Sequence, residues 1–306
     1  MKAVSVRNIS KCYGKVQALN NLNFDVEQGE IFGLIGPDGA GKTSLFRILT
    51  TLMLADSGTA TVEGLDVVRD YKEIRRIVGY MPGRFSLYQD LTVEENLSFF
   101  ATVFHTTIEE NYHLIEDIYK QIEPFKTRRA GKLSGGMKQK LALSCALIHK
   151  PKVLFLDEPT TGVDPVSRKE FWEMLLKLKR QGISILVSTP YMDEAKLCDR
   201  IALIQEGRFL KIDTPENIVA GYTGTLWAVK ADKMHRLLWD LREYPHMASA
   251  FSFGDTYHVL LSEDGNPDDL KNYLTKSGYS DVEIEQIRPS VEDCFMSMLK
   301  NDKEER

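Results

Sequence analysis

The sequence predicts an α/β domain organised around a phosphate-binding loop, followed by a small α+β domain of ferredoxin-like order. Three observations predict this arrangement. An apolar strand at 31–35 leads through the glycine-rich segment 36–44 into a helical pattern, and a second apolar strand at 153–156 ends in two carboxylates. From about residue 223 the pattern restarts as β-α-β-β-α-β. A chain of 306 residues is long enough for about two domains.

The segment 36–44 reads Gly-Pro-Asp-Gly-Ala-Gly-Lys-Thr-Ser, which matches G-x-x-x-x-G-K-[ST] in the expected strand-loop-helix context. Glycines let consecutive N–H groups converge on one point, and the following helix adds its positive N-terminal dipole. In such a loop Lys42 reaches the β- and γ-phosphates and the Thr43 hydroxyl binds Mg²⁺. The sequence therefore predicts nucleoside triphosphate binding. The strand before the loop and the helix after it disfavour the alternative, an incidental glycine-rich turn.

Composition excludes several other classes of protein. The chain is 43% hydrophobic and 27% charged, as globular proteins are, and its net charge of −5 gives no general attraction to nucleic acid or anionic lipid. Cys12, Cys145, Cys198 and Cys294 are scattered, which predicts reduced thiols rather than a disulfide framework or a zinc site. No apolar run approaches the ~18–20 residues of a membrane span, and the N-terminus lacks a signal-peptide pattern. We therefore expect any action at a membrane to take place from outside the bilayer, and no nucleic-acid partner.

Alternating apolar and polar residues predict strands at 3–7 and 22–26. Tyr13 lies between them, upstream of the phosphate loop. An aromatic ring there is suitably placed to stack on a nucleotide base. An ordinary packed or surface tyrosine fits the position equally well.

The middle of the chain predicts a strand at 59–62, a helix at 72–76, a strand at 77–81 and then a helical region at about 83–150. Thr92 and Glu95 form a capping box for a helix that continues through residue 104. The loop before it carries four large side chains, and they predict a docking surface for a partner: Arg84, Phe85, Leu87 and Tyr88. Burial of some of them is the simpler alternative.

A second glycine-rich turn, Leu-Ser-Gly-Gly-Met-Lys-Gln at 133–139, opens another helix. Ser134, Gly135 and Gly136 by themselves form only an N-cap followed by two permissive glycines. Beside the first loop, their N–H groups are able to hold the far side of the same phosphate.

Asp157 and Glu158 follow the apolar strand at 153–156. The carboxyl end of a buried strand is where an α/β sheet places groups that bind ligands. We expect Asp157 to hold Mg²⁺ through water and Glu158 to polarise the attacking water. Two acids that merely cap the loop are the alternative.

Taken with Tyr13 and 161–164 (Thr-Gly-Val-Asp), these motifs have the order and spacing found in ABC transporters. The chain resembles the ATP-binding subunit of such a transporter over about residues 3–220. The resemblance implies that two subunits, identical or different, pair head to tail around two ATP molecules. Each site then takes its phosphate loop from one subunit and the segment equivalent to 133–136 from the other. It also implies a transmembrane permease partner and a peripheral place on the inner face of the cytoplasmic membrane.

Segments 36–42, 80–82 and 191–195 are similar to multidrug-type exporters of bacterial inner membranes, which implies export of a drug-like or hydrophobic substrate. The implied cofactors are ATP and Mg²⁺, with Glu158 catalytic and Thr43 and Asp157 at the metal. The residues expected to bind the nucleotide are Tyr13, Gly36, Asp38, Gly39, Ala40, Gly41, Lys42, Thr43, Ser44, Ser134, Gly135 and Gly136.

Two positions depart from the family pattern. Gly83 stands where the family usually has a glutamine after Tyr-Met-Pro, and Pro190 stands where it has a histidine after the strand at 183–189. Neither residue offers a polar side chain. The resemblance therefore implies intact Mg-ATP binding and a site of reduced catalytic capacity. Its alternative is a non-hydrolysing, ATP-gated subunit in a heterodimer.

The predicted domains are an ATP-binding domain at 1–222, an accessory domain at 223–300 and a disordered charged tail at 301–306. In the accessory domain we expect strands at 226–231, 248–253, 257–261 and 282–287, and helices at 234–242, 266–277 and 290–299. It has no catalytic loop and no metal-ligand spacing. A packed accessory module or a dimerisation module is expected, with regulation as its one functional role.

Overall fold

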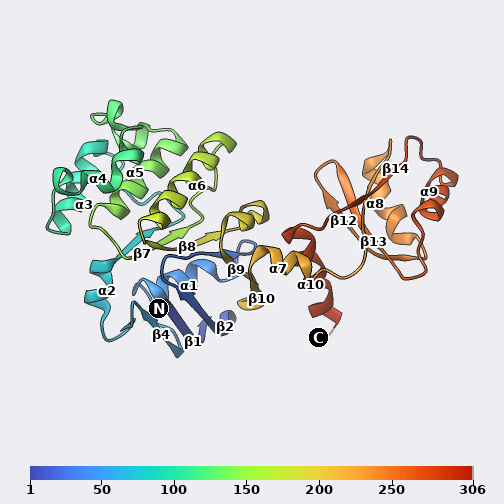
Figure 1. The fold of residues 1–306 in the computed structure, drawn as a ribbon, viewed down its shortest axis with the longest axis horizontal. Coiled ribbons are helices and arrows are strands. Elements are labelled where there is room, and N and C mark those ends of the chain that lie inside the picture. The colour runs from blue at the N-terminus through green and yellow to red at the C-terminus, as the bar shows by residue number, and fades with distance from the viewer. Residues whose placement is uncertain (305–306) are drawn as a thin grey trace. The chain divides into compact units, whose positions relative to one another are not determined.

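The computed structural model describes residues 1–304 and divides into two compact units, Met1–Pro215 and Glu216–Arg306 (Figure 1). The division falls at the start of α7 (Pro215–Ala220), a few residues before the predicted boundary at 222.

A six-stranded sheet forms the centre of the first unit, in the order β10-β9-β3-β8-β7-β6. Its strands are β3 (Ile31–Ile35), β6 (Val78–Met81), β7 (Val153–Asp157), β8 (Ser184–Thr189), β9 (Arg200–Gln205) and β10 (Arg208–Asp213). All neighbours are parallel except β10, an edge strand that the sequence analysis left unassigned. Every residue of β3, β7 and β8 is buried, as expected for parallel strands covered on both faces. Parallel strands bring their carboxyl ends to one edge, where the predicted motifs begin.

A second, antiparallel sheet has the order β2-β1-β4-β5, with β1 (Lys2–Tyr13), β2 (Val16–Glu27), β4 (Ser57–Val62) and β5 (Leu65–Asp66). Helix α1 (Lys42–Leu49) contacts β2 and β4 on this sheet and β7 on the other, so one apolar core joins the two sheets. The first two strands are longer than predicted. Their outer halves are exposed or half-buried apart from Ile9 and Leu19, and they stay extended because each strand pairs with the other as far as Tyr13 and Val16.

The helical part of the first unit comprises α2 (Tyr71–Ile77), α3 (Val93–Val103), α4 (Ile108–Tyr119), the 3-10 helices η1 (Glu123–Phe125) and η2 (Ala130–Lys132), and α5 (Gly135–Leu147). It is followed by α6 (Pro165–Arg180) and, after β8, by η3 (Met192–Leu197). The predicted capping box is confirmed: the Thr92 hydroxyl accepts from the Glu95 amide, and the Glu95 carboxylate accepts from the Thr92 amide.

The second unit has the predicted order: β11 (Leu226–Lys230), α8 (Met234–Glu243), β12 (Met247–Phe253), β13 (Thr256–Leu261), α9 (Pro267–Lys276) and β14 (Glu283–Ile287). Its antiparallel sheet runs β12-β13-β11-β14, and α8 and α9 cover one face over their own apolar core. On the other face His258 of β13 pairs with Asp293 of α10 (Val291–Glu304) at 2.7 Å.

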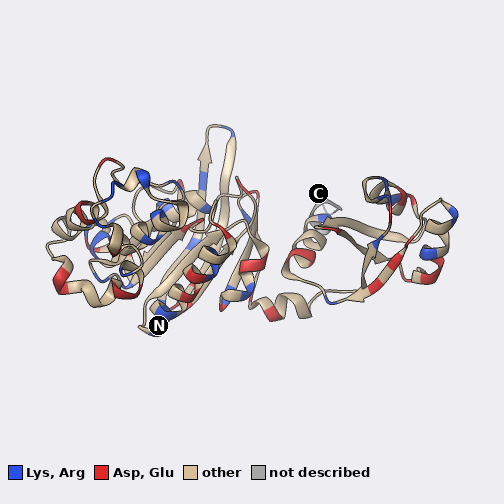
Figure 2. Cartoon of the chain, turned by 90° about the horizontal axis from the view of Figure 1, so that it is seen from above, with Lys and Arg blue, Asp and Glu red and all other residues tan. Residues whose placement is uncertain are grey.

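The tail differs from its prediction. Helix α10 continues through Glu304, because each added residue gains an i→i−4 backbone bond; residues 305–306 lie outside the described part. Acidic and basic residues are interspersed along both units (Figure 2). No described helix is both long and apolar enough to cross a bilayer.

Candidate nucleotide-binding and hydrolysis site

The phosphate loop leaves the sheet at the end of β3 and ends in α1. A Cβ atom at Gly36 would collide with the carbonyl of Ile204, and one at Gly41 with the carbonyl of Ala18. Gly41 also has a φ of +105°, a left-handed value that favours glycine. The loop therefore passes close to its neighbours, and it leads into the first turn of α1, whose backbone N–H groups lack intrahelical partners and suit an anion.

Lys42 lies inside this loop and is only 3% exposed. Its ammonium donates to the carbonyls of Gly36 at 2.8 Å and Pro37 at 2.9 Å, and forms an ion pair with Glu158 Oε1 at 3.1 Å. An ammonium group has three N–H donors, so these contacts account for all of them. The structure thus brings together the phosphate loop and the pair of acids after β7, which lie more than a hundred residues apart in the sequence. The anion in contact with Lys42 is the carboxylate of Glu158.

The two acids sit where β7 meets β8. Asp157 ends β7 and is 2% exposed, and its Oδ1 accepts a hydrogen bond of 2.7 Å from the Ser188 hydroxyl. Glu158 has a φ of +50°, and its amide donates to the Ser188 carbonyl and hydroxyl at 3.0 and 3.1 Å. Burial, and next the charge of Asp157, raise the pKa of nearby Tyr80 to about 12, so this phenol is neutral at physiological pH.

Ser188 is a residue to which the sequence analysis assigned no role. Its strand was predicted at 183–189, but the pairing of Asp157 with Ser188 is a matter of strand register between β7 and β8. The one signal in the sequence that could have identified Ser188 is a serine near the carboxyl end of a second buried strand.

The donor set fits a magnesium ion. Within the described residues Asp157 Oδ2 accepts no hydrogen bond, and the Thr43 hydroxyl follows Lys42 on the first turn of α1. Carboxylate and hydroxyl oxygens are ligands that Mg²⁺ prefers, usually together with phosphates and water. The described residues contain no group of three or more His, Cys, Asp or Glu side chains that could hold a metal ion.

The two departures from the family pattern both lie at this edge of the sheet. A Cβ atom at Gly83 would stand 3.0 Å from the Asp157 carbonyl, so position 83 adjoins the acids and presents no side chain to them. Pro190 follows the last residue of β8 directly. The preceding Thr189 carbonyl accepts from the Gly36 amide at 3.2 Å, which ties this end of β8 to the phosphate loop.

Tyr13 also reaches the loop. It ends β1, and its hydroxyl lies 3.2 Å from the Ser44 hydroxyl and donates to the Met53 sulfur at 3.0 Å. The side chain remains 45% exposed. An exposed aromatic ring beside the helix of the phosphate loop leaves a face available to a base.

Ser134, Gly135 and Gly136 lie elsewhere. Ser134 caps α5 by accepting from the Met137 amide at 3.3 Å. A Cβ atom at Gly135 or Gly136 would meet Gly162 or Ser167, after the two acids, rather than the phosphate loop. From the residues alone, we expect this turn to hold the same phosphate as the chain's own loop. The residues that surround Gly135 and Gly136 do not support that expectation.

The predicted docking loop needs one correction. Arg84 and Tyr88 are exposed and Phe85 is half-buried, but Leu87 is buried, because its side chain packs into the unit. Leu87 instead lines a groove of about 680 Å³ between β6 and the helices α3 and α5. Other lining residues are Leu52, Val78, Tyr80, Phe100, Val103, Phe104, Cys145 and His149.

The mainly apolar lining also holds polar residues, among them Arg47, Arg75 and His149. The His149 ring stacks on Phe104 with centroids 3.8 Å apart, and its Nε2 lies 2.9 Å from the Val78 carbonyl. Burial lowers the pKa of His149, so the imidazole is neutral at physiological pH and donates through Nε2.

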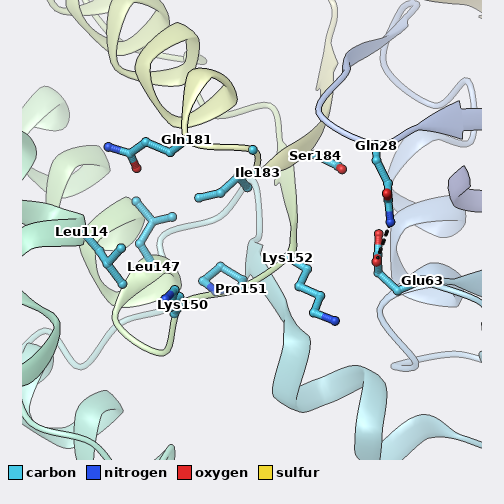
Figure 3. Close-up of a pocket in the computed structure, with 11 residues that line it drawn as sticks. Gln28, Glu63, Leu114, Leu147, Lys150, Pro151, Lys152, Gln181, Ile183 and Ser184 are labelled. Carbon is cyan, nitrogen blue, oxygen red and sulfur yellow. Dashed lines mark hydrogen bonds between the residues drawn. The ribbon is translucent and has the colours of Figure 1, made fainter. Parts of the chain in front are cut away.

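A different cavity, of about 520 Å³, lies at the opposite, amino-terminal edge of the sheet (Figure 3). Pro151 and Lys152 precede β7 there, and Ile183 and Ser184 line it from the start of β8. It contains none of the predicted site residues.

Comparison with known proteins places these features in context. Residues 19–161 match the sequence family described as ABC transporter. The chain is 38% identical, over 92% of its length, to the probable multidrug ABC transporter ATP-binding protein YbhF of Escherichia coli (strain K12) and spans 49% of that protein. It therefore covers about half the length of this relative.

Two further matches cover most of the other protein. The daunorubicin resistance ATP-binding protein DrrA2 of Streptomyces coeruleorubidus is 41% identical over 72% of this chain and 70% of its own. A solved structure, the dimeric post-hydrolysis state of the ATP-binding cassette MJ0796 bound to ADP and Pi, has a TM-score of 0.63 at 25% identity, over 69% of this chain and 98% of that one.

Proposed function

The chain belongs to the ATP-binding subunits of ABC transporters, and from this premise we propose that it powers export of a drug-like or hydrophobic substrate across the cytoplasmic membrane. It would do so from the inner face of that membrane, together with a permease. The multidrug and daunorubicin-resistance names of its relatives favour this substrate class.

The ion pair between Lys42 and Glu158 is the observation that supports the use of ATP by this chain. A triphosphate that enters the loop offers Lys42 a stronger anion than one carboxylate, because phosphate oxygens also accept the converging N–H groups of α1. Glu158 is then released beside the terminal phosphate, in reach of an attacking water. Thr43 and Asp157 would hold the Mg²⁺ ion, which supplies neutralisation of phosphate charge.

The turn at Ser134 favours a two-subunit site. Ser134 and Gly135 are exposed at the start of α5, and the glycines adjoin the segment after the acids rather than the chain's own loop. We infer that this turn completes the nucleotide site of a second cassette. Tyr13 would stack on the base at the chain's own site.

Gly83 and Pro190 favour a more specific version of this function. Removal of one positioned catalytic group commonly costs a factor of about 10²–10³ in rate, and groups acting on the same water are not additive. A homodimer would contain two depleted sites. We therefore favour a heterodimeric ATPase in which this chain's own site binds ATP without rapid turnover and its Ser134 turn serves the catalytic site of the partner.

Two variants of the reconstituted complex test this version. Glu158→Gln should change ATP turnover little, because it alters the depleted site, whereas Ser134→Arg should abolish turnover by blocking the partner's site. Phosphate release measured at saturating Mg-ATP gives the result. Loss of turnover in Glu158→Gln as complete as in Ser134→Arg would instead make this chain's own site catalytic.

The groove beside β6 supports the permease contact. Its lining is mainly apolar, and Leu52 and Val103 at its rim are 57% and 52% exposed. An apolar face of a short helix from the permease would bury these side chains. For the second unit, which has its own apolar core, we propose an accessory role in dimerisation or regulation.

A further inference from the structure

Strand β8 carries two fully buried serines, one at each end. Ser184, at its start, accepts the Gly29 amide at 3.0 Å, far from the acids. Ser188, near its end, contacts both Asp157 and Glu158. The two residues share a strand and a degree of burial but differ in what their hydroxyl groups hold.

The hydrogen bonds of Ser188 have one consistent direction. An ionised carboxylate can only accept hydrogen bonds. The Ser188 hydroxyl therefore donates its hydrogen to Asp157 Oδ1, at 2.7 Å. A lone pair of the same oxygen is then free to accept the Glu158 amide at 3.1 Å, which also reaches the Ser188 carbonyl at 3.0 Å. One side chain thereby orients the first acid and holds the backbone of the second.

Both acids need such support. Glu158 is a non-glycine residue at φ +50°, a conformation that surrounding contacts must maintain. Among the described residues, Ser188 is the one side chain that hydrogen-bonds Asp157. Gly83, which adjoins Asp157, and Pro190, which follows β8, contribute no polar side chain.

We propose that Ser188 is a positioning residue for the metal site and for Glu158. Its hydroxyl fixes the rotation of the Asp157 carboxylate and leaves Oδ2 for the Mg²⁺ shell, and it keeps Glu158 turned toward Lys42. This inference rests on the proposed roles of Asp157 and Glu158, and it adds to them a residue that touches neither nucleotide nor metal.

The test measures binding of the fluorescent analogue TNP-ATP by the full chain, once in excess Mg²⁺ and once in EDTA. In Ser188→Ala the dissociation constant in Mg²⁺ should rise about tenfold, the lower end of the effect of an outer-shell partner on metal affinity. The constant in EDTA should stay at the wild-type value. Ser184→Ala removes a matched buried hydroxyl from the same strand and should change neither constant.

The thermal unfolding midpoint shows whether each variant is folded. Two further variants keep the test valid if Ser188→Ala fails to fold. Ser188→Thr keeps the hydroxyl and should keep both constants, whereas Ser188→Cys has a similar size with a weak donor and should behave as Ser188→Ala does. If Ser188→Ala does not fold, the same two dissociation constants are compared between Ser188→Thr and Ser188→Cys.

Each outcome separates this inference from the function it rests on. If wild type responds to Mg²⁺ and Ser188→Ala responds equally, or if both constants rise by the same factor in the variant, Ser188 has no positioning role while the proposed function stands. If wild-type binding is the same in Mg²⁺ and EDTA, the metal site at Asp157 is wrong and the inference falls with it.

Discussion

Lys42 shows how a single charged residue is accommodated when it is almost fully buried. A buried ammonium is stable only when its donors are satisfied, and two loop carbonyls together with Glu158 satisfy them here. Two of these acceptors belong to the loop itself, so the ammonium is already aimed at the centre of the loop. In the proposed site, a phosphate would only have to replace Glu158 as the third acceptor.

Replacement of Lys42 should therefore weaken nucleotide binding. Lys42→Ala removes a charge-assisted contact of about 1.5–3 kcal/mol, which corresponds to a rise of about 10–150-fold in the dissociation constant for Mg-ATP. Isothermal titration calorimetry measures this change, and Lys72→Ala, an exposed lysine on α2, is the control. Equal affinities of wild type and Lys42→Ala would refute the assignment of the loop.

At the scale of elements, the groove arises because α3 and α5 pack beside the edge strand β6 without closing over it. An aromatic contact lies in its lining: the rings of Phe104 and His149 stack with centroids 3.8 Å apart. A row of half-exposed apolar side chains along a groove of this size is typical of a surface that another protein covers.

A charge placed on this rim should prevent permease binding. Val103→Asp puts a carboxylate where an apolar helix face is expected, so it should abolish co-purification with the permease while Mg-ATP affinity stays unchanged. Val68 is similarly exposed, at 57%, and does not line the groove, so Val68→Asp is the control. Undiminished co-purification of Val103→Asp would exclude this groove as the contact.

The whole molecule has two separate cores, one between the two sheets of the first unit and one beneath α8 and α9. All the predicted nucleotide-binding residues lie in the first unit. A ligand stabilises only the cooperative unit that binds it.

Calorimetry should therefore detect two unfolding transitions. Mg-ATP at a hundred times its dissociation constant adds about 2.7 kcal/mol and should raise one midpoint by about 5–10 °C. Leu237→Ala, in the fully buried part of the second core, should cost about 2–5 kcal/mol and lower the other. A single transition that responds to both changes would show that the two units unfold together.

The sequence predicted most elements correctly because their signals are local. The capping box at Thr92, the strand-loop-helix around Lys42 and the β-α-β-β-α-β order of the second unit each depend on a few neighbouring residues. Errors occurred where partners far along the chain decide the outcome. The outer halves of β1 and β2 are extended because they pair with each other, and Leu87 is buried because helices from later in the chain enclose it.

The sequence by itself determined that this chain carries a phosphate loop, a strand ending in two acids and two positions without the usual polar side chains. Each of these is a matter of residue type within one short segment. Only the tertiary structure decided that Glu158 contacts Lys42, that Gly83 adjoins Asp157 and that Ser188 holds both acids. These contacts depend on the register of parallel strands, and parallel strands are joined by long connections whose sequence does not encode that register locally.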